Sequence, residues 1–287
     1  MKSERTGEGR ASWWRTNLVW TGYTLLLVPE AVMILALLCA YWALGAPLLG
    51  LFVVLLIVSF ITRMLALLAA RMSFAAGHYY EAAGLAHVAL ALNPWSADVL
   101  ALRGAIALAQ GQPELAEGAL RRAIALLPGQ PTFHAALAGA LLDMDRPVQA
   151  AAAARRALEL EERCAVAYLY LAEAERAAGA PADTIEERLR AGLAVAAEPA
   201  AEAALRCALG EHLLTERRMA EASLTIYGAE ALLARCPTSR QVELRVRLGE
   251  LLIAQGQVER AREHFRSVEA LDPHGRYARA AWRASHL

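Results

Sequence analysis

The chain has 287 residues, enough for one extended domain or two compact ones. Its formal net charge is zero, which excludes the overall basic field that nucleic-acid binding uses. Alanine, leucine, glutamate and arginine dominate, and no alternating strand pattern follows residue 62. The sequence therefore predicts an all-α protein.

The first sixth of the chain has the composition of a membrane segment. Residues 1–17 form a polar, net basic tail, and between residues 18 and 62 only Glu30 is charged. The turn at 45–47 (Gly-Ala-Pro) divides the apolar run, so we predict a transmembrane hairpin over 18–62 with helices at about 20–44 and 48–66. The alternative is a cleaved signal peptide, but the apolar run is too long and a second span follows at once.

The charges around the hairpin predict its orientation. Basic residues flank both of its ends, at Arg10, Arg15, Arg63 and Arg71. By the positive-inside rule both ends lie in the cytoplasm, and so does the rest of the chain. The alanine, leucine and arginine bias favours a bacterial inner membrane.

Glu30 is costly inside hydrocarbon unless it is neutral, paired or near the headgroups. Glu30 precedes the turn at Ala46 by nearly the same length of chain as Arg63 follows it, so an antiparallel hairpin places the two at a similar depth. We hypothesise a Glu30–Arg63 pair that holds the register of the hairpin. The alternatives are a protonated Glu30, contact with a partner's membrane helix, and a helix that starts at Pro29 with Glu30 in its first turn.

One period of a helix-turn-helix repeat can be recognised at residues 242–275. Small residues at Gly249 and Ala261 allow two antiparallel helices to approach, Gly256 makes the turn, and Pro273 ends the second helix. The large residues that fill the seam are Leu248, Leu252, Val258 and Phe265. Prolines in the last place of the unit recur at Pro94, Pro128 and Pro237.

This pattern resembles the tetratricopeptide repeat (TPR), a helix-turn-helix unit of about 34 residues. The resemblance implies a right-handed α-solenoid of about six units over 63–275, with the first helix of unit one continuous with the second membrane helix. We expect the second helix of unit four to be shifted, starting at Asp183 with Glu186 placed for a capping box, and that of unit five to run on to Cys236. Residues 276–287 are expected to form a capping helix that lays Tyr277 and Trp282 on the last repeat. The layout of two spans followed by repeats also resembles HemY-type membrane proteins, at the level of architecture alone.

In this family the first helices of successive units line a concave groove. Transferred position by position, the C-terminal half of the groove would be lined by Leu169, Glu173, Arg176, Cys207, Glu211, Leu214, Val246, Glu250 and Ile253. Its ninth place is glutamate in three successive units, and such a row would favour a basic or amphipathic segment of a protein partner. The alternative is a solvated charged face. The lysine and asparagine clamp with which some family members hold an acidic tail is absent.

The sequence contains no arrangement that predicts catalysis, a metal or another cofactor. The seven histidines are scattered without a paired-ligand spacing, and the four cysteines (Cys39, Cys164, Cys207, Cys236) are far apart. Cys207 and His212 lie on one predicted helix, at a spacing that does not bring their side chains face to face. We therefore do not expect an enzyme.

The leading hypothesis is a membrane-anchored scaffold or adaptor that recruits or positions a protein partner through its groove. The alternative is an accessory structural subunit of a multi-protein membrane complex, in which the hairpin makes the main contacts. Fold class says little about which partner is held, and the sequence leaves the oligomeric state open.

Overall fold

The computed structural model describes residues 36–42, 47–273 and 275–285. In these ranges the regular structure is helical and contains no strand, which confirms the all-α prediction. The N-terminal tail, Glu30 and most of the first predicted membrane helix lie outside the described residues, apart from the helical residues 36–42.

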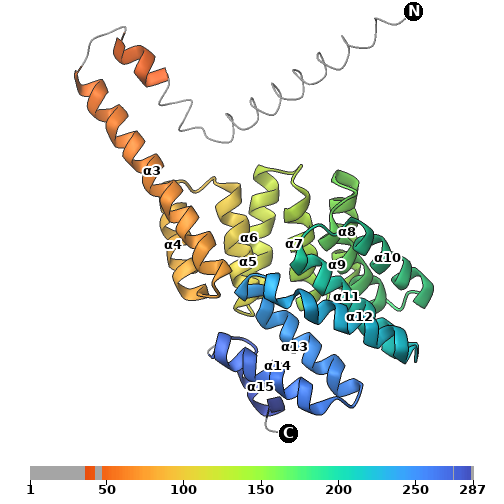
Figure 1. Ribbon diagram of the computed structural model, residues 1–287. Helices are drawn as coiled ribbons and strands as arrows, with labels where there is room; N and C mark the ends of the chain where they lie inside the picture. Colours follow the sequence, from red (N-terminus) through yellow and green to blue (C-terminus); the bar gives the residue numbers. More distant parts are fainter. Residues whose placement is uncertain (1–35, 43–46, 274, 286–287) are drawn as a thin grey trace, which may run out of the picture.

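Six antiparallel helix pairs form a curved row within the described residues (Figure 1). The pairs are α3 (Pro47–Ala75) with α4 (Tyr79–Leu92), α5 (Ala97–Ala109) with α6 (Pro113–Leu126), α7 (Pro131–Asp143) with α8 (Pro147–Leu160), α9 (Ala165–Ala177) with α10 (Ala182–Val195), α11 (Pro199–Thr215) with α12 (Met219–Leu232), and α13 (Thr238–Ala254) with α14 (Val258–Leu271). A short helix, α15 (Ala278–Ser285), packs on α14.

Helix α3 is longer than the other helices. It has 29 residues without a break, and its N-terminal half projects beyond the repeats in Figure 1. Its C-terminal half pairs with α4. Among the described residues, it is the one helix long and apolar enough to cross a membrane, over Gly50–Ala75. Arg63 is 5% exposed on this helix, and its guanidinium lies 5.4 Å from the centre of the Phe60 ring.

The turn between the two helices of each pair has one residue with positive φ. These residues are Gly77, Gly111, Asp145, Gly179, Arg217 and Gly256, with φ between 55° and 88°. The first four are evenly spaced in the sequence, while the last two intervals are longer. The additional residues lie mainly in α11 and α13, which have 17 residues where α5, α7 and α9 have 13. Units five and six therefore have first helices about one turn longer.

Two expected irregularities are corrected by the structure. Helix α10 begins at Ala182, one residue before the expected Asp183, but with 14 residues it is as long as α6 and α8. Glu186 pairs with Arg218 and Arg190 and makes no capping box. The surplus residues after α10 form the first turn of α11, where Pro199 is favoured at the start of a helix. Helix α12 ends at Leu232 and is followed by a 3₁₀ turn, Leu233–Arg235.

The core lies in the seams between paired helices, where glycine allows close approach. A Cβ on Gly249 would lie 2.5 Å from Cζ of Phe265, and one on Gly104 would lie 2.7 Å from Cγ of Leu120. At the C-terminal end Tyr277 packs on the last core cluster, as expected. The indole of Trp282 is 58% exposed instead, because Ala281 occupies the buried face of α15.

Candidate functional site: a groove closed at one end

The curved row of helices brings the last repeat against the first. The phenol of Tyr79 donates a hydrogen bond to the backbone oxygen of Ser239 (3.4 Å), across 160 residues of sequence. The methyl group of Thr238 lies 3.7 Å from the place of a Cβ on Gly77. Thr238 and Ser239 belong to the additional first turn of α13, so the extra length of this helix allows these contacts.

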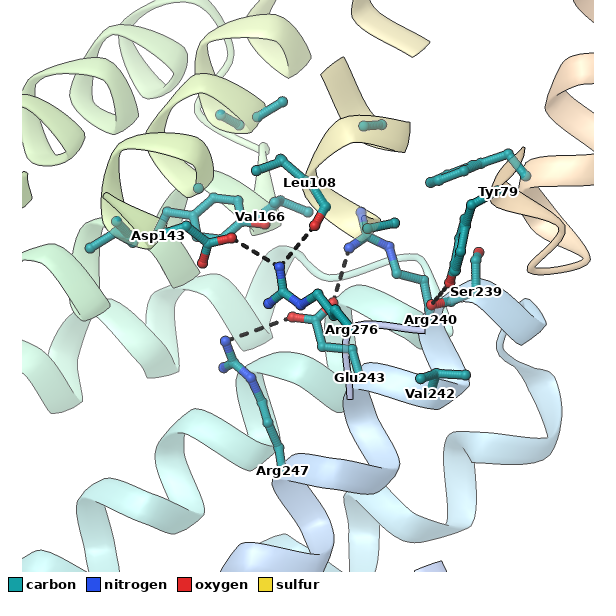
Figure 2. A pocket seen from close by; sticks show the side chains of 18 of the residues that line it. Tyr79, Leu108, Asp143, Val166, Ser239, Arg240, Val242, Glu243, Arg247 and Arg276 are labelled. Atoms are coloured by element: carbon teal, nitrogen blue, oxygen red, sulfur yellow. Dashed lines mark hydrogen bonds and ion pairs between the residues drawn. The ribbon is translucent and has the colours of Figure 1, made fainter. Parts of the chain in front are cut away.

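Arg276 makes a second contact across the same opening (Figure 2). Its guanidinium donates to the backbone oxygen of Leu108 (2.8 Å) at the end of α5 and to the carboxylate of Asp143 (3.1 Å) at the end of α7. The same group lies 4.5 Å from the centre of the Tyr277 ring. The loop between α14 and α15 therefore holds the ends of two earlier helices.

These contacts enclose a cavity of about 310 Å³ between the first four repeats and the last one. Its charged side chains pair with one another. Arg247 bonds to Glu173 (2.6 Å) and lies 3.7 Å from Glu243, which Arg240 also approaches at 3.4 Å. Burial opposes ionisation of Glu243, but Arg247 and Arg240 more than offset it, so its pKa is lowered. Burial raises the pKa of Tyr170 to about 12, so its phenol keeps its proton even in alkaline solution.

A second cavity, of about 640 Å³, continues the groove between α9, α11 and α13 and is more open to solvent. We call it the open groove. It is lined by Glu173, Arg176, Ala177, Cys207, Glu211, Leu214, Thr215, Arg247, Glu250, Leu251 and Ala254. Six of the nine residues predicted for the groove are in this lining. Leu169 and Val246 are instead buried in the core clusters, and Ile253 is 41% exposed on α13.

No protein-family model and no curated protein matches the chain. Several solved structures share its fold. PilW, a widely conserved type IV pilus biogenesis factor, has a TM-score of 0.52 at 17% identity, over 78% of this chain and 98% of PilW. PilF of Pseudomonas aeruginosa has a TM-score of 0.51 at 15% identity, with the same coverage. The Cut9–Hcn1 hetero-tetramer of the APC/C has a TM-score of 0.59 at 13% identity, over 77% of this chain and 42% of that one.

The chain has the TPR fold. PilW and PilF are TPR proteins, and the turns of the first four units of this chain recur at the even spacing that the TPR period requires. At these identities the comparison establishes the fold alone, so the site must be argued from the residues of this TPR solenoid.

The three glutamates of the groove lie together but are not equivalent. Glu173 is held by Arg247 and its side chain is 17% exposed, whereas Glu211 pairs with Arg176 (2.8 Å) and is 55% exposed. Glu250 lines the same groove from α13, and its pKa is raised by burial and by the charge of Glu211, against the opposing effect of Arg247. Two of the three groove glutamates are thus already paired with arginines of the same groove.

Arg240 and Arg247 were not predicted as site residues, because neither occupies a groove place of the TPR pattern. A signal was present in their spacing. Arg240, Glu243 and Arg247 lie three and four positions apart, so they share one face of α13. That face points into the enclosed cavity (Figure 2).

The thiol in the groove is not suited to nucleophilic chemistry. Cys207 is 1% exposed, and burial raises its pKa to about 12. A thiol reacts as the thiolate, which is scarce at neutral pH when the pKa is this high. Across the described ranges, no group of three His, Cys, Asp or Glu side chains could hold a metal ion.

Proposed function

We propose that the protein is a membrane-anchored TPR scaffold. One observation carries the proposal: the projecting half of α3 exposes apolar side chains on several sides. Leu51, Phe52, Leu55 and Val58 are each 50–59% exposed. A 29-residue helix with this surface matches the hydrocarbon of a bilayer better than water.

The basic residues of α3 support an orientation. Arg63 and Arg71 follow the apolar half of the helix and lie where it enters the repeats. The positive-inside rule then places the solenoid in the cytoplasm, at a bacterial inner membrane. Because α3 is also the first helix of repeat one, the solenoid would be held rigidly and not by a flexible tether.

The partner would be a protein segment bound in the open groove. This groove combines the apolar side chain of Leu214 with the carboxylates of Glu211 and Glu250. In the Arg176–Glu211 pair the glutamate side chain is 55% exposed, whereas that of Arg176 is 28% exposed, so the carboxylate is open to a further cation from solvent. A basic side chain on an amphipathic segment could therefore bind Glu211 from the exposed side of its carboxylate, opposite Arg176.

The anchor is tested by extraction of membranes with alkaline carbonate. The full chain should stay in the membrane pellet. Val54→Lys combined with Val58→Lys should move it toward the supernatant, because each charge at the centre of a span costs about 2.5–3.5 kcal/mol. Val148→Lys is the matched control, since Val148 is also exposed but lies on α8. Release of the unaltered chain by carbonate would contradict the proposal that α3 anchors the protein in the membrane.

The groove is tested by a photocrosslinking residue at Ile253, next to the open groove, in the full chain in native membranes. We expect discrete protein adducts that disappear after Glu211→Lys with Glu250→Lys. The same probe at Leu115, which is 59% exposed on α6, is the control. Adducts that are equal at both positions, or that survive charge reversal, would contradict partner binding in the groove.

The closed end of the groove favours a second candidate, an accessory structural subunit of a membrane complex. The charged side chains that line the enclosed cavity already pair with one another. Helix α3 has the most extensive exposed apolar surface of the described residues. In that case a crosslinker at Leu55 would capture partner helices. Those partners would also copurify in a fixed ratio after mild detergent extraction, with the groove variants still bound.

A further inference from the structure

The loop between α4 and α5 carries an exposed indole on a hydrogen-bonded turn. Trp95 is 75% exposed, although Asn93, two positions earlier, is 6% exposed. The side-chain oxygen of Asn93 accepts a hydrogen bond from the backbone N–H of Trp95 (3.0 Å). The large side chain is therefore presented outward by a turn whose base is buried.

This loop lies beside the middle of α3, where the helix leaves the solenoid (Figure 1). Helices α3 and α4 are antiparallel about the turn at Gly77. Arg63 and Ala91 are equally far from Gly77 in the sequence, one before it and one after it, so the two are at the same height. By the same count residue 93, where the loop begins, stands level with about residue 61 of α3.

The length of α3 places the membrane surface near that height. A span needs about 20 residues at about 1.5 Å each to cross about 30 Å of hydrocarbon. Counted from the start of α3 at Pro47, that distance ends near residue 66, within the first repeat. The free side of α3 is still apolar there, since Leu65 is 61% and Leu68 is 56% exposed.

The charge of the loops that connect successive repeats changes with distance from α3. The loops between successive repeats at 93–96 (Asn-Pro-Trp-Ser) and 127–130 (Leu-Pro-Gly-Gln) contain no charged residue. The next one, at 161–164, contains Glu161, Glu162 and Arg163. The uncharged loops are those of the repeats nearest α3, and the carboxylates, which an anionic lipid surface would repel, begin with the third repeat.

We propose that the lipid surface is the partner of this edge: the loops at 93–96 and 127–130 lie in the headgroup region, with Trp95 as the interfacial anchor. Tryptophan prefers this depth because its ring is apolar while its N–H can reach water. The helices of the first two repeats then lie roughly along the membrane normal, with these two loops facing the bilayer. This inference rests on the proposed position of α3 in the bilayer.

The test measures quenching of tryptophan fluorescence by dibrominated phosphatidylcholine in vesicles that contain the full chain. Three variants each keep one tryptophan, with the native tryptophans otherwise replaced by phenylalanine: Trp95 alone, Trp282 alone, and Val54→Trp alone. Trp282 is the matched control, because it is also exposed but lies on α15, away from the projecting half of α3 (Figure 1). Circular dichroism verifies that each variant is folded.

We expect the brominated lipid to quench Val54→Trp most, to quench Trp95 clearly, and to leave Trp282 unchanged. Acrylamide, a quencher dissolved in water, should show the reverse order. If Val54→Trp is quenched while Trp95 behaves like Trp282, the inference about this edge is wrong and the anchor stands. If Val54→Trp is not quenched, both fail. Equal quenching of Trp95 and Trp282 would also overturn the inference.

Discussion

Gly249 faces the ring of Phe265 at the closest approach of α13 and α14, and no larger residue fits there without a shift. The missing Cβ thus allows an aromatic ring to fill the seam of the last repeat. The same exchange of a small residue for a large one occurs at Gly210, where a Cβ would lie 2.7 Å from Cγ1 of Ile226. At this scale, stability depends on pairs of residues and not on single ones.

Gly249→Ala is predicted to destabilise the protein by about 1–3 kcal/mol, because the ring of Phe265 must leave its position. The thermal midpoint, followed by circular dichroism in detergent, should fall by several degrees. Phe265→Leu in the same chain should restore part of the loss. Gly118→Ala is the control: it lies within α6 with no atom within 4 Å of the added Cβ, and it should stabilise by up to about 1 kcal/mol. Equal effects of the two glycine substitutions would refute the packing argument.

The raised pKa of Glu250 predicts that the stability of the protein depends on pH. Its pKa is raised in the folded state by burial and by Glu211, so its protonated form is favoured there, and stability is lost as pH rises through the folded pKa. Glu250→Gln should therefore raise the thermal midpoint at pH 7.5 and leave it unchanged below the unfolded pKa of about 4.3. Glu259→Gln, at a side chain that is 81% exposed, serves as the control. A lower midpoint for Glu250→Gln at pH 7.5 would contradict the assignment.

The turn of each helix pair is the element in which the repeat is most regular. All six pairs in the described ranges use a left-handed residue, and four of these are glycine. Asp145 and Arg217 adopt the same conformation with φ of 55° and 61°, which is strained for residues with a Cβ. The first helices can lengthen by a turn in units five and six without disturbing this feature.

Arg217→Gly is predicted to raise stability by about 0.5–1 kcal/mol, because relief of the strained backbone exceeds the entropy that glycine loses on folding. Gly256→Ala, the converse change at the equivalent place, should lower stability by about 1 kcal/mol. Thermal unfolding of both variants in the same detergent compares them directly. A destabilised Arg217→Gly would mean that the arginine side chain contributes more than its backbone costs.

Closure of the groove is a property of the whole molecule. Tyr79 and Arg276 join repeats that are far apart in sequence, and their side chains line the enclosed cavity. The two surfaces proposed for a partner are the open groove and the projecting half of α3. The scaffold and subunit hypotheses therefore differ in which of these two surfaces the partner contacts.

Arg276→Ala is predicted to widen the opening, because it removes the bonds to Leu108 and Asp143. Spin labels at Glu81 and Arg283, in a Cys39→Ser background whose remaining cysteines are buried, would report the distance between the first and last repeats. The distance distribution should become longer and broader. Arg279→Ala, at an exposed position of α15, is the control and should leave the distribution unchanged. An unchanged distribution in Arg276→Ala would show that the helix packing alone closes the ring.

The sequence by itself determined the helical units. Glycine at a turn, small residues opposite Phe265 and proline after a helix act within one unit, so a period of about 34 residues makes them legible. The three groove glutamates could be placed on one surface for the same reason. The transmembrane hairpin, the Glu30–Arg63 pair and the assignment of a partner to the groove stay predictions.

Only the tertiary structure decided what the groove glutamates face. Arg247 reaches Glu173 across 74 residues, and Arg276 reaches Leu108 across 168, because small rotations between successive repeats accumulate into a ring. No local pattern records the sum of those rotations. A one-turn extension of α13, unremarkable in the sequence, brings Ser239 to Tyr79 and closes the groove.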